Sequence, residues 1–245
     1  MKKTILTIPC LILFIILSGF CGHDHILRPN PLQPIPSSAE ISTALKQALQ
    51  HGTSKSVDQL SAENGFFGDP SVKILFPPEA KQAESTLRKL GQNKLCDDVI
   101  HSLNRAAEDA AQQAKPIFIN AINQMTMLDV SNILLGPNDA ATQYFRRTTS
   151  AQLSAAFKPV IQNSLNKVGA TKYYGTAAAQ YNKIPFVKSK INPNITDYAT
   201  QKAIDGLFFE IAQEELNIRK NIAARTTPQL QSVFGFADGA QKQQQ

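Results

Sequence analysis

Apolar side chains recur every three to four positions from about residue 41 to residue 234, with polar residues between them. In the first such stretch Ile41 and Leu45 keep this spacing, and Ser37 with Glu40 forms a capping box just ahead of it. This spacing places the apolar side chains on one face of a helix. The sequence therefore predicts an all-α fold, a single-domain multi-helix bundle.

Glycine and proline indicate where these helices end or bend. We expect Gly52 to interrupt the first helix, and Pro116 to kink or break a later one because proline lacks the backbone donor. Thr227 followed by Pro228 is typical of an N-cap with proline at the first helical position. Residues 72–76 alone resemble a short strand. We expect Pro-kinked helices and at most one very short β pairing.

The first 22 residues have the parts of an export signal. Lys2 and Lys3 precede an apolar run over residues 5–17, and small residues follow. Leu-Ser-Gly ahead of Cys21 resembles a bacterial lipobox, but Phe20 stands where a small residue is usual. Two routes remain open, namely a lipid anchor on Cys21 or ordinary cleavage near residues 19–22.

The rest of the chain divides into three parts. Four prolines within residues 23–36 favour an extended polyproline spacer between the signal and the folded part. The helical domain is expected over residues 37–235. Residues 236–245 are polar and rich in glutamine, and we expect them to be disordered.

Composition and charge narrow the class of protein. Hydrophobic residues make up 42% and charged residues 18%, which is typical of a soluble folded protein and excludes a disordered or membrane-embedded one. The net charge of +6 includes Lys2 and Lys3, and the remaining basic residues are scattered among acids. No basic stripe with stacking aromatics is present, so nucleic acid is not an expected partner. Mild attraction to an anionic membrane surface is compatible with this charge.

The densest polar chemistry lies in residues 136–157. A helix there places hydroxyl, amide and guanidinium groups beside its packing face, and these groups suit a carboxylate or phosphate. The alternative is that an arginine forms an internal ion pair, for which Glu108 or Asp109 would serve. The candidate binding residues are Thr142, Gln143, Arg146, Arg147 and Thr149.

No catalytic arrangement is evident. His51 and His101 stand alone, and no motif pairs a nucleophile with a base or gathers metal ligands. We therefore expect no cofactor and no metal site. The favoured hypothesis is a non-catalytic binding or scaffolding module for an envelope partner or a small anionic ligand. The alternative is a carrier of a lipid or other apolar ligand between helices, and a hydrolase ranks last.

Six motifs stand out along the chain, namely Glu63-Asn64-Gly65-Phe66, Leu103-Asn104-Arg105-Ala106-Ala107-Glu108, residues 136–149, Ile184-Pro185-Phe186-Val187, Ala203-Ile204-Asp205-Gly206-Leu207-Phe208 and Ala224-Arg225-Thr226-Thr227. As a set they resemble the bacterial domain-of-unknown-function 4197 family. The resemblance spans about residues 41–235 and implies an exported, mainly helical protein. It implies no activity and carries over no catalytic residue. From the export signal we expect the protein in the periplasm, free or anchored at the membrane through its N-terminus.

Overall fold

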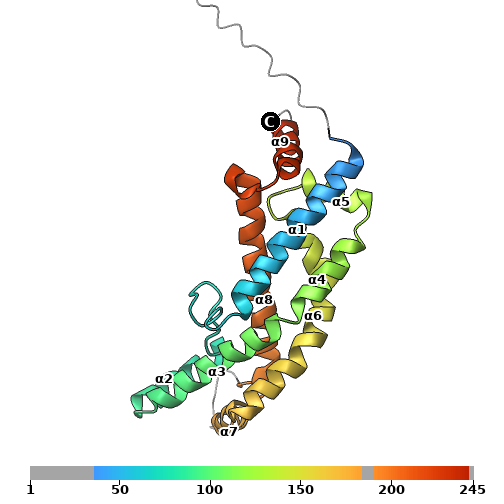
Figure 1. The fold of residues 1–245 in the computed structure, drawn as a ribbon. Helices are drawn as coiled ribbons and strands as arrows, with labels where there is room; N and C mark the ends of the chain where they lie inside the picture. Colours follow the sequence, from blue (N-terminus) through green and yellow to red (C-terminus); the bar gives the residue numbers. More distant parts are fainter. Residues whose placement is uncertain (1–35, 184–189, 243–245) are drawn as a thin grey trace, which may run out of the picture. The chain divides into compact units, whose positions relative to one another are not determined.

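A computed structural model describes residues 36–183 and 190–242, and these residues fold as helices joined by loops (Figure 1). The predicted signal segment 1–22 with Cys21, nearly all of the spacer 23–36, and the last three residues of the predicted tail lie outside this description. The helices are α1 (Ser38–Ser61), a 3-10 turn η1 (Pro78–Ala80), α2 (Lys81–Lys89), α3 (Asn93–Ala111), α4 (Ala114–Asn123), α5 (Met127–Leu134), α6 (Ala140–Lys167), α7 (Ala170–Tyr181), α8 (Ile195–Lys220), a 3-10 turn η2 (Ile222–Ala224) and α9 (Pro228–Lys242).

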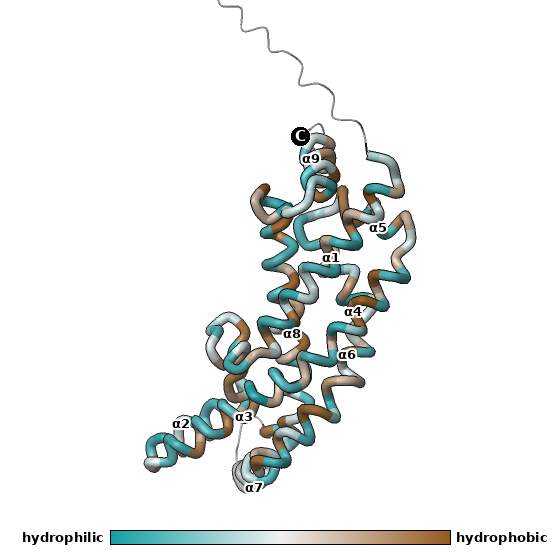
Figure 2. The backbone as a smooth tube through the Cα atoms, in the orientation of Figure 1, coloured by the Kyte–Doolittle hydropathy of each residue, from teal (hydrophilic) through white to brown (hydrophobic). Residues whose placement is uncertain are grey.

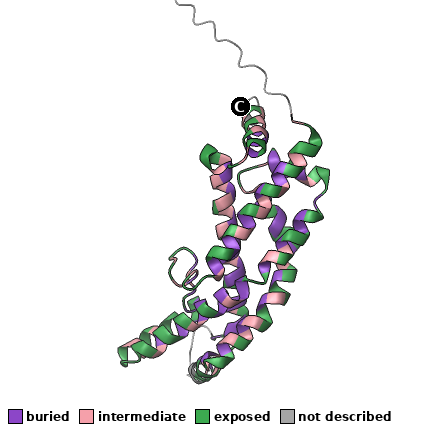
Figure 3. Ribbon diagram, viewed as in Figure 1, coloured by how far each residue is buried: buried purple, intermediate pink, exposed green. Residues whose placement is uncertain are grey.

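The long helices build the core. Helix α6 packs against α8 and α3, and α1 packs against α8, α4 and α9. Buried side chains lie on the facing sides of these helices, whereas α2 contributes no buried residue (Figures 2 and 3). Five phenylalanines are fully buried in this core, namely Phe66, Phe118, Phe145, Phe157 and Phe208. The predicted all-α bundle is confirmed, and no strand occurs in the described residues.

Gly52 does not interrupt the first helix. The predicted capping box of Ser37 and Glu40 starts α1, which then runs without a break to Ser61. Gly52 is buried, and a Cβ atom at this position would lie 3.3 Å from the Glu214 side chain and 3.7 Å from that of Ile218. The glycine therefore allows α8 to approach α1 closely, a role that its effect on helix propensity does not reveal.

The expected strand over residues 72–76 is absent, although the segment alternates as a strand does. Val72, Ile74 and Phe76 are buried, and Lys73 and Leu75 turn outward. The backbone of Ile74 pairs with a side chain: its N–H donates to the Asn104 amide oxygen, and its carbonyl accepts from the amide nitrogen, both at 2.8 Å. An asparagine on α3 thus replaces the missing partner strand.

Pro116 and Pro159 differ in their effect on the helices that contain them. Pro116 lies in the first turn of α4, just after the chain breaks between α3 and α4, as predicted. Pro159 lies inside α6, which continues through it.

The tail requires a correction. Residues 236–242 were expected to be disordered, but α9 extends to Lys242, with Ala237 buried and Asp238 paired to Arg225 at 2.7 Å. Helix α9 begins as predicted, with the Thr227 hydroxyl accepting from the Leu230 N–H and Pro228 first in the helix. No helix in the described ranges is both long and apolar enough to cross a bilayer.

Gly206 fixes the packing of the loop that follows α1 onto α8. A Cβ atom at this position would lie 2.7 Å from Cε1 of buried Phe66 and 3.2 Å from Cβ of Val72. We expect Gly206→Ala to lower the free energy of unfolding by about 1–2 kcal/mol, because overpacking outweighs the gain in helix propensity. Gly239→Ala in α9 is the control, since no atom lies within 4 Å of its Cβ position. Urea denaturation measures both variants, and a Gly206→Ala protein as stable as Gly239→Ala would contradict this packing.

Candidate functional site

The five predicted binding residues lie on α6 but not on one surface. Thr142 and Thr149 are buried, and their hydroxyls donate within the protein, that of Thr142 to Glu215 and that of Thr149 to the carbonyl of Phe145. Gln143, Arg146 and Arg147 are exposed. Only these three remain as donors for a ligand, and we call them the α6 face.

Arg146 is held in place without an acidic partner. Its guanidinium carbon lies 4.6 Å from the centre of the Phe208 ring on α8, a cation–π distance. No ion pair joins Arg146 to any residue that the structure describes. Its guanidinium is therefore oriented by the ring while its donors stay available to solvent.

Arg147 lies beside Tyr144 and Asp129. Its guanidinium carbon is 5.6 Å from the Tyr144 ring, and its terminal nitrogen is 4.0 Å from the Asp129 carboxylate. The pKa of Asp129 is lowered chiefly by the Thr126 hydroxyl and then by the Thr126 N–H, which belong to the capping box of α5, and least by Arg147. Asp129 is thus primarily a helix cap, and Arg147 is only loosely engaged by it.

The predicted internal partners of these arginines are used elsewhere. Glu108 is buried, lies 3.3 Å from Arg105, and accepts hydrogen bonds from the N–H groups of Phe66 and Phe67. Asp109 lies 3.6 Å from Arg105. Neither acid reaches the α6 face, so an internal ion pair with Glu108 or Asp109 is not formed.

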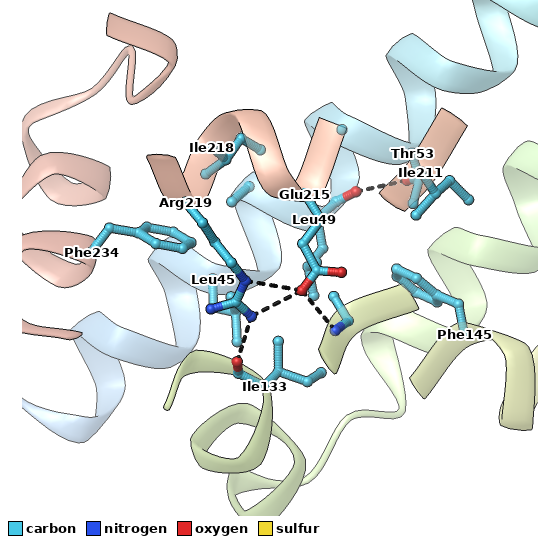
Figure 4. Close-up of a pocket in the computed structure, with 13 residues that line it drawn as sticks. Leu45, Leu49, Thr53, Ile133, Phe145, Ile211, Glu215, Ile218, Arg219 and Phe234 are labelled. Carbon is cyan, nitrogen blue, oxygen red and sulfur yellow. Dashed lines mark hydrogen bonds and ion pairs between the residues drawn. The ribbon is translucent and has the colours of Figure 1, made fainter. Parts of the chain in front are cut away.

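The first turn of α6 is bound by a carboxylate from α8. Both oxygens of Glu215 are used, and all three hydrogen bonds measure 2.9 Å. One oxygen accepts from the Ala141 N–H (Figure 4), and the other accepts from the N–H and hydroxyl of Thr142. Asp139, the residue just before this helix, makes no capping bond with its side chain and accepts from Gln143 instead. Glu215 supplies the cap from a distant part of the chain, where the helix dipole favours a negative charge.

Arg219 completes this arrangement. It donates to Glu215 at 2.9 Å and also to the carbonyls of Ile133 and Leu134, at 2.6 Å and 3.3 Å, where α5 ends (Figure 4). Both side chains of this ion pair are nearly inaccessible, at 6% and 8% exposure. The sequence did carry a signal: Glu215 and Arg219 follow Ile211 at helical steps on the inward face of α8, where charged residues are rare.

The comparisons identify the family. The model of the family described as Protein of unknown function (DUF4197) matches residues 36–235. The chain belongs to this family. Neither curated proteins nor solved structures gave a significant match.

Several motifs behind the DUF4197 resemblance hold the fold together. Asn104 and Glu108 bind the loop after α1, and Glu215 binds the start of the 136–149 motif. Arg225 of the last motif is buried and donates to the carbonyls of Ile218 and Arg219, where α8 ends. These residues have structural partners and need no ligand to explain them.

The interior offers little space and no metal cluster. The space beneath α1, lined by Leu45, Gly52 and Phe145 among others, measures about 30 Å³, room for about one water molecule. Within residues 36–183 and 190–242 no group of three or more His, Cys, Asp or Glu side chains is placed to hold a metal ion. Cys96 is buried and unpaired, and His101 contacts the Phe67 ring edge-on.

The Glu215 contacts predict a selective loss of stability. We expect Thr142→Val to lower the free energy of unfolding by about 1.5–3 kcal/mol, because the charged carboxylate loses the hydroxyl that donates to it. Thr148→Val is the matched control: the Thr148 hydroxyl donates only to the Tyr144 carbonyl of its own helix on the exposed side. The control should change stability by less than about 0.5 kcal/mol. Equal losses in thermal or urea unfolding would show that Glu215 does not depend on Thr142.

Proposed function

We propose that this DUF4197 protein is a non-catalytic binding module of the cell envelope that grips an anionic group of a partner through its α6 face. The observation that carries the proposal is Arg146, an exposed guanidinium held over the Phe208 ring with no acidic partner among the described residues. A fixed planar donor of this kind suits a carboxylate or phosphate, which it can bind through two parallel hydrogen bonds.

The neighbouring side chains support the same interpretation. Arg147 is 67% exposed at its side chain and lies at the limit of an ion pair with Asp129, so a better acceptor can compete for it. Gln143 lies one turn before Arg147 and adds an amide donor. Two cations and an amide on one stretch of a rigid helix form a surface that favours an anion without any reactive centre.

The carrier hypothesis has less support from the described residues. A lipid chain needs an apolar cavity of several hundred Å³, as small-molecule sites generally do. The internal space beneath α1 measures about 30 Å³. The space beneath α1 is too small for a lipid chain, and this favours the binding module over a carrier that holds its ligand there.

The proposal predicts that partner capture depends on the two arginines. In pull-downs from envelope extracts, Arg146→Ala combined with Arg147→Ala should weaken retention of the partner about 10–100-fold, the effect of losing a charged bidentate contact. The control, Lys94→Ala with Lys172→Ala, removes the same charge from exposed lysines outside α6. Identical partner lists from wild type and the arginine variant would exclude the α6 face.

We further propose that the chain is exported to the periplasm by residues 1–22. The mature protein should lack most of this segment when its N-terminus is sequenced. Labelling cells with a radioactive fatty acid separates the two routes: a lipid anchor gives a label that Cys21→Ser abolishes and Cys96→Ser retains, and ordinary cleavage gives no label. A full-length, cytoplasmic protein would contradict export.

A further inference from the structure

An open groove separates the loop before α2 from one face of α8. We call it the 71–78 groove; it is lined by residues 71–76, 78 and 81 and by Tyr198, Lys202, Asp205, Gly206 and Phe209 of α8, and it measures about 400 Å³. Tyr198, Lys202, Asp205 and Phe209 follow one another at steps of three and four, so they share one face of the helix. No residue of α6 lines this groove, which makes it a site separate from the α6 face.

One edge of the backbone in this groove is only partly paired with the described residues, because the Lys73 N–H donates to the Asp69 carbonyl while other groups beside it have no such partner. Ile74 directs its N–H and carbonyl to the Asn104 side chain. Neighbouring residues of an alternating segment direct these groups to the opposite side. On that side the Leu75 carbonyl accepts from the Tyr198 hydroxyl at 3.0 Å, whereas the Leu75 N–H and the Lys73 carbonyl have no hydrogen-bond partner among the described residues. One donor and one acceptor thus remain free along an edge, as an unpaired strand presents them.

The side chains around this edge are basic and apolar. Lys73, Lys81 and Lys202 line the groove against a single acid, Asp205, which lies 3.8 Å from Lys202. Lys81 is exposed and forms no ion pair with any residue of the described ranges. Leu75 and Phe209 expose 49% and 38% of their surface, and both line the groove, so they can add apolar contacts to a ligand bound there.

The groove therefore offers three kinds of contact to a ligand, namely free backbone groups, lysine charges and exposed apolar side chains. A lipid headgroup would use the lysines alone, but the free donor and acceptor of the backbone fit another backbone. Strand addition uses such main-chain bonds for affinity and alternate side chains for specificity. We propose that the 71–78 groove binds an extended acidic peptide segment of a partner protein, which pairs with Lys73 and Leu75 as an added strand and places carboxylates against Lys81 and Lys202.

The test measures fluorescence anisotropy of an end-capped eight-residue peptide that alternates valine and glutamate, titrated with the full chain. Binding should be saturable and should weaken as salt is raised. Leu75→Pro removes the free N–H together with the leucine side chain and fixes φ, and Lys81→Glu with Lys202→Glu reverses two exposed charges. Each change should weaken binding roughly tenfold. Leu75→Ala keeps the N–H and is the control, expected to bind within about threefold of wild type.

Two further arms keep the outcome decisive if Leu75→Pro fails to fold. The same peptide with alternate backbone nitrogens methylated should bind the wild-type chain poorly, as should a valine-lysine peptide. Wild-type affinity in the Arg146→Ala, Arg147→Ala variant would show that this site is independent of the α6 face. The proposal is overturned if the methylated peptide binds as well as the parent, or if phosphatidylglycerol vesicles displace the peptide from the wild-type chain and fail to bind the lysine-reversal variant.

Discussion

Glu215 and Arg219 on α8 satisfy the ends of two other helices at once. The carboxylate binds the free N–H groups that start α6, and the guanidinium binds the free carbonyls that end α5. Each charge alone would be costly in this dry environment, but the two are paired, and each also meets a helix end of opposite partial charge. The turn between α5 and α6 can therefore lie against α8 without buried groups left unpaired. Removing either charge would leave the other buried and unpaired. The pair therefore fixes how α5, α6 and α8 pack together.

Polar side chains bind free backbone groups at other points where the chain leaves a helix. Glu108 binds the N–H groups of Phe66 and Phe67, and Asn104 binds both backbone groups of Ile74. Arg225 binds the carbonyls at the end of α8 and pairs with Asp238 of α9. A helical protein has no sheet to absorb such groups, so buried polar side chains take that task. Glu108 and Asn104 lie 30 to 42 residues from the groups that they bind, so these two side chains also fasten the loop after α1 to α3.

These contacts explain what the sequence could and could not predict. Helical periodicity and local caps indicated the bundle, the capping box at Ser37 and the start of α9 at Pro228, because these signals lie within a few residues of one another. The predicted helix break at Gly52 and the predicted strand over residues 72–76 were wrong because both roles depend on distant partners. These partners are α8 for the glycine and Asn104 for the segment. The candidate site could likewise be predicted only in part. The pattern located the helix that carries the arginines, but only the tertiary structure shows that Thr142 faces Glu215.

Many polar side chains bind groups inside the protein, which reduces the number of surface sites that can bind a ligand. A side chain whose donors are saturated by buried backbone offers nothing to a ligand, which removes Thr142, Glu215 and Arg219 however prominent their motifs are in the sequence. Arg146, held over an aromatic ring, and Lys81, at the edge of a groove, form no ion pair with any described residue and stay available. Both are cations, and an anionic partner of the kind proposed above would meet them, whereas the buried carboxylates of Glu108 and Glu215 are already bound to backbone N–H groups.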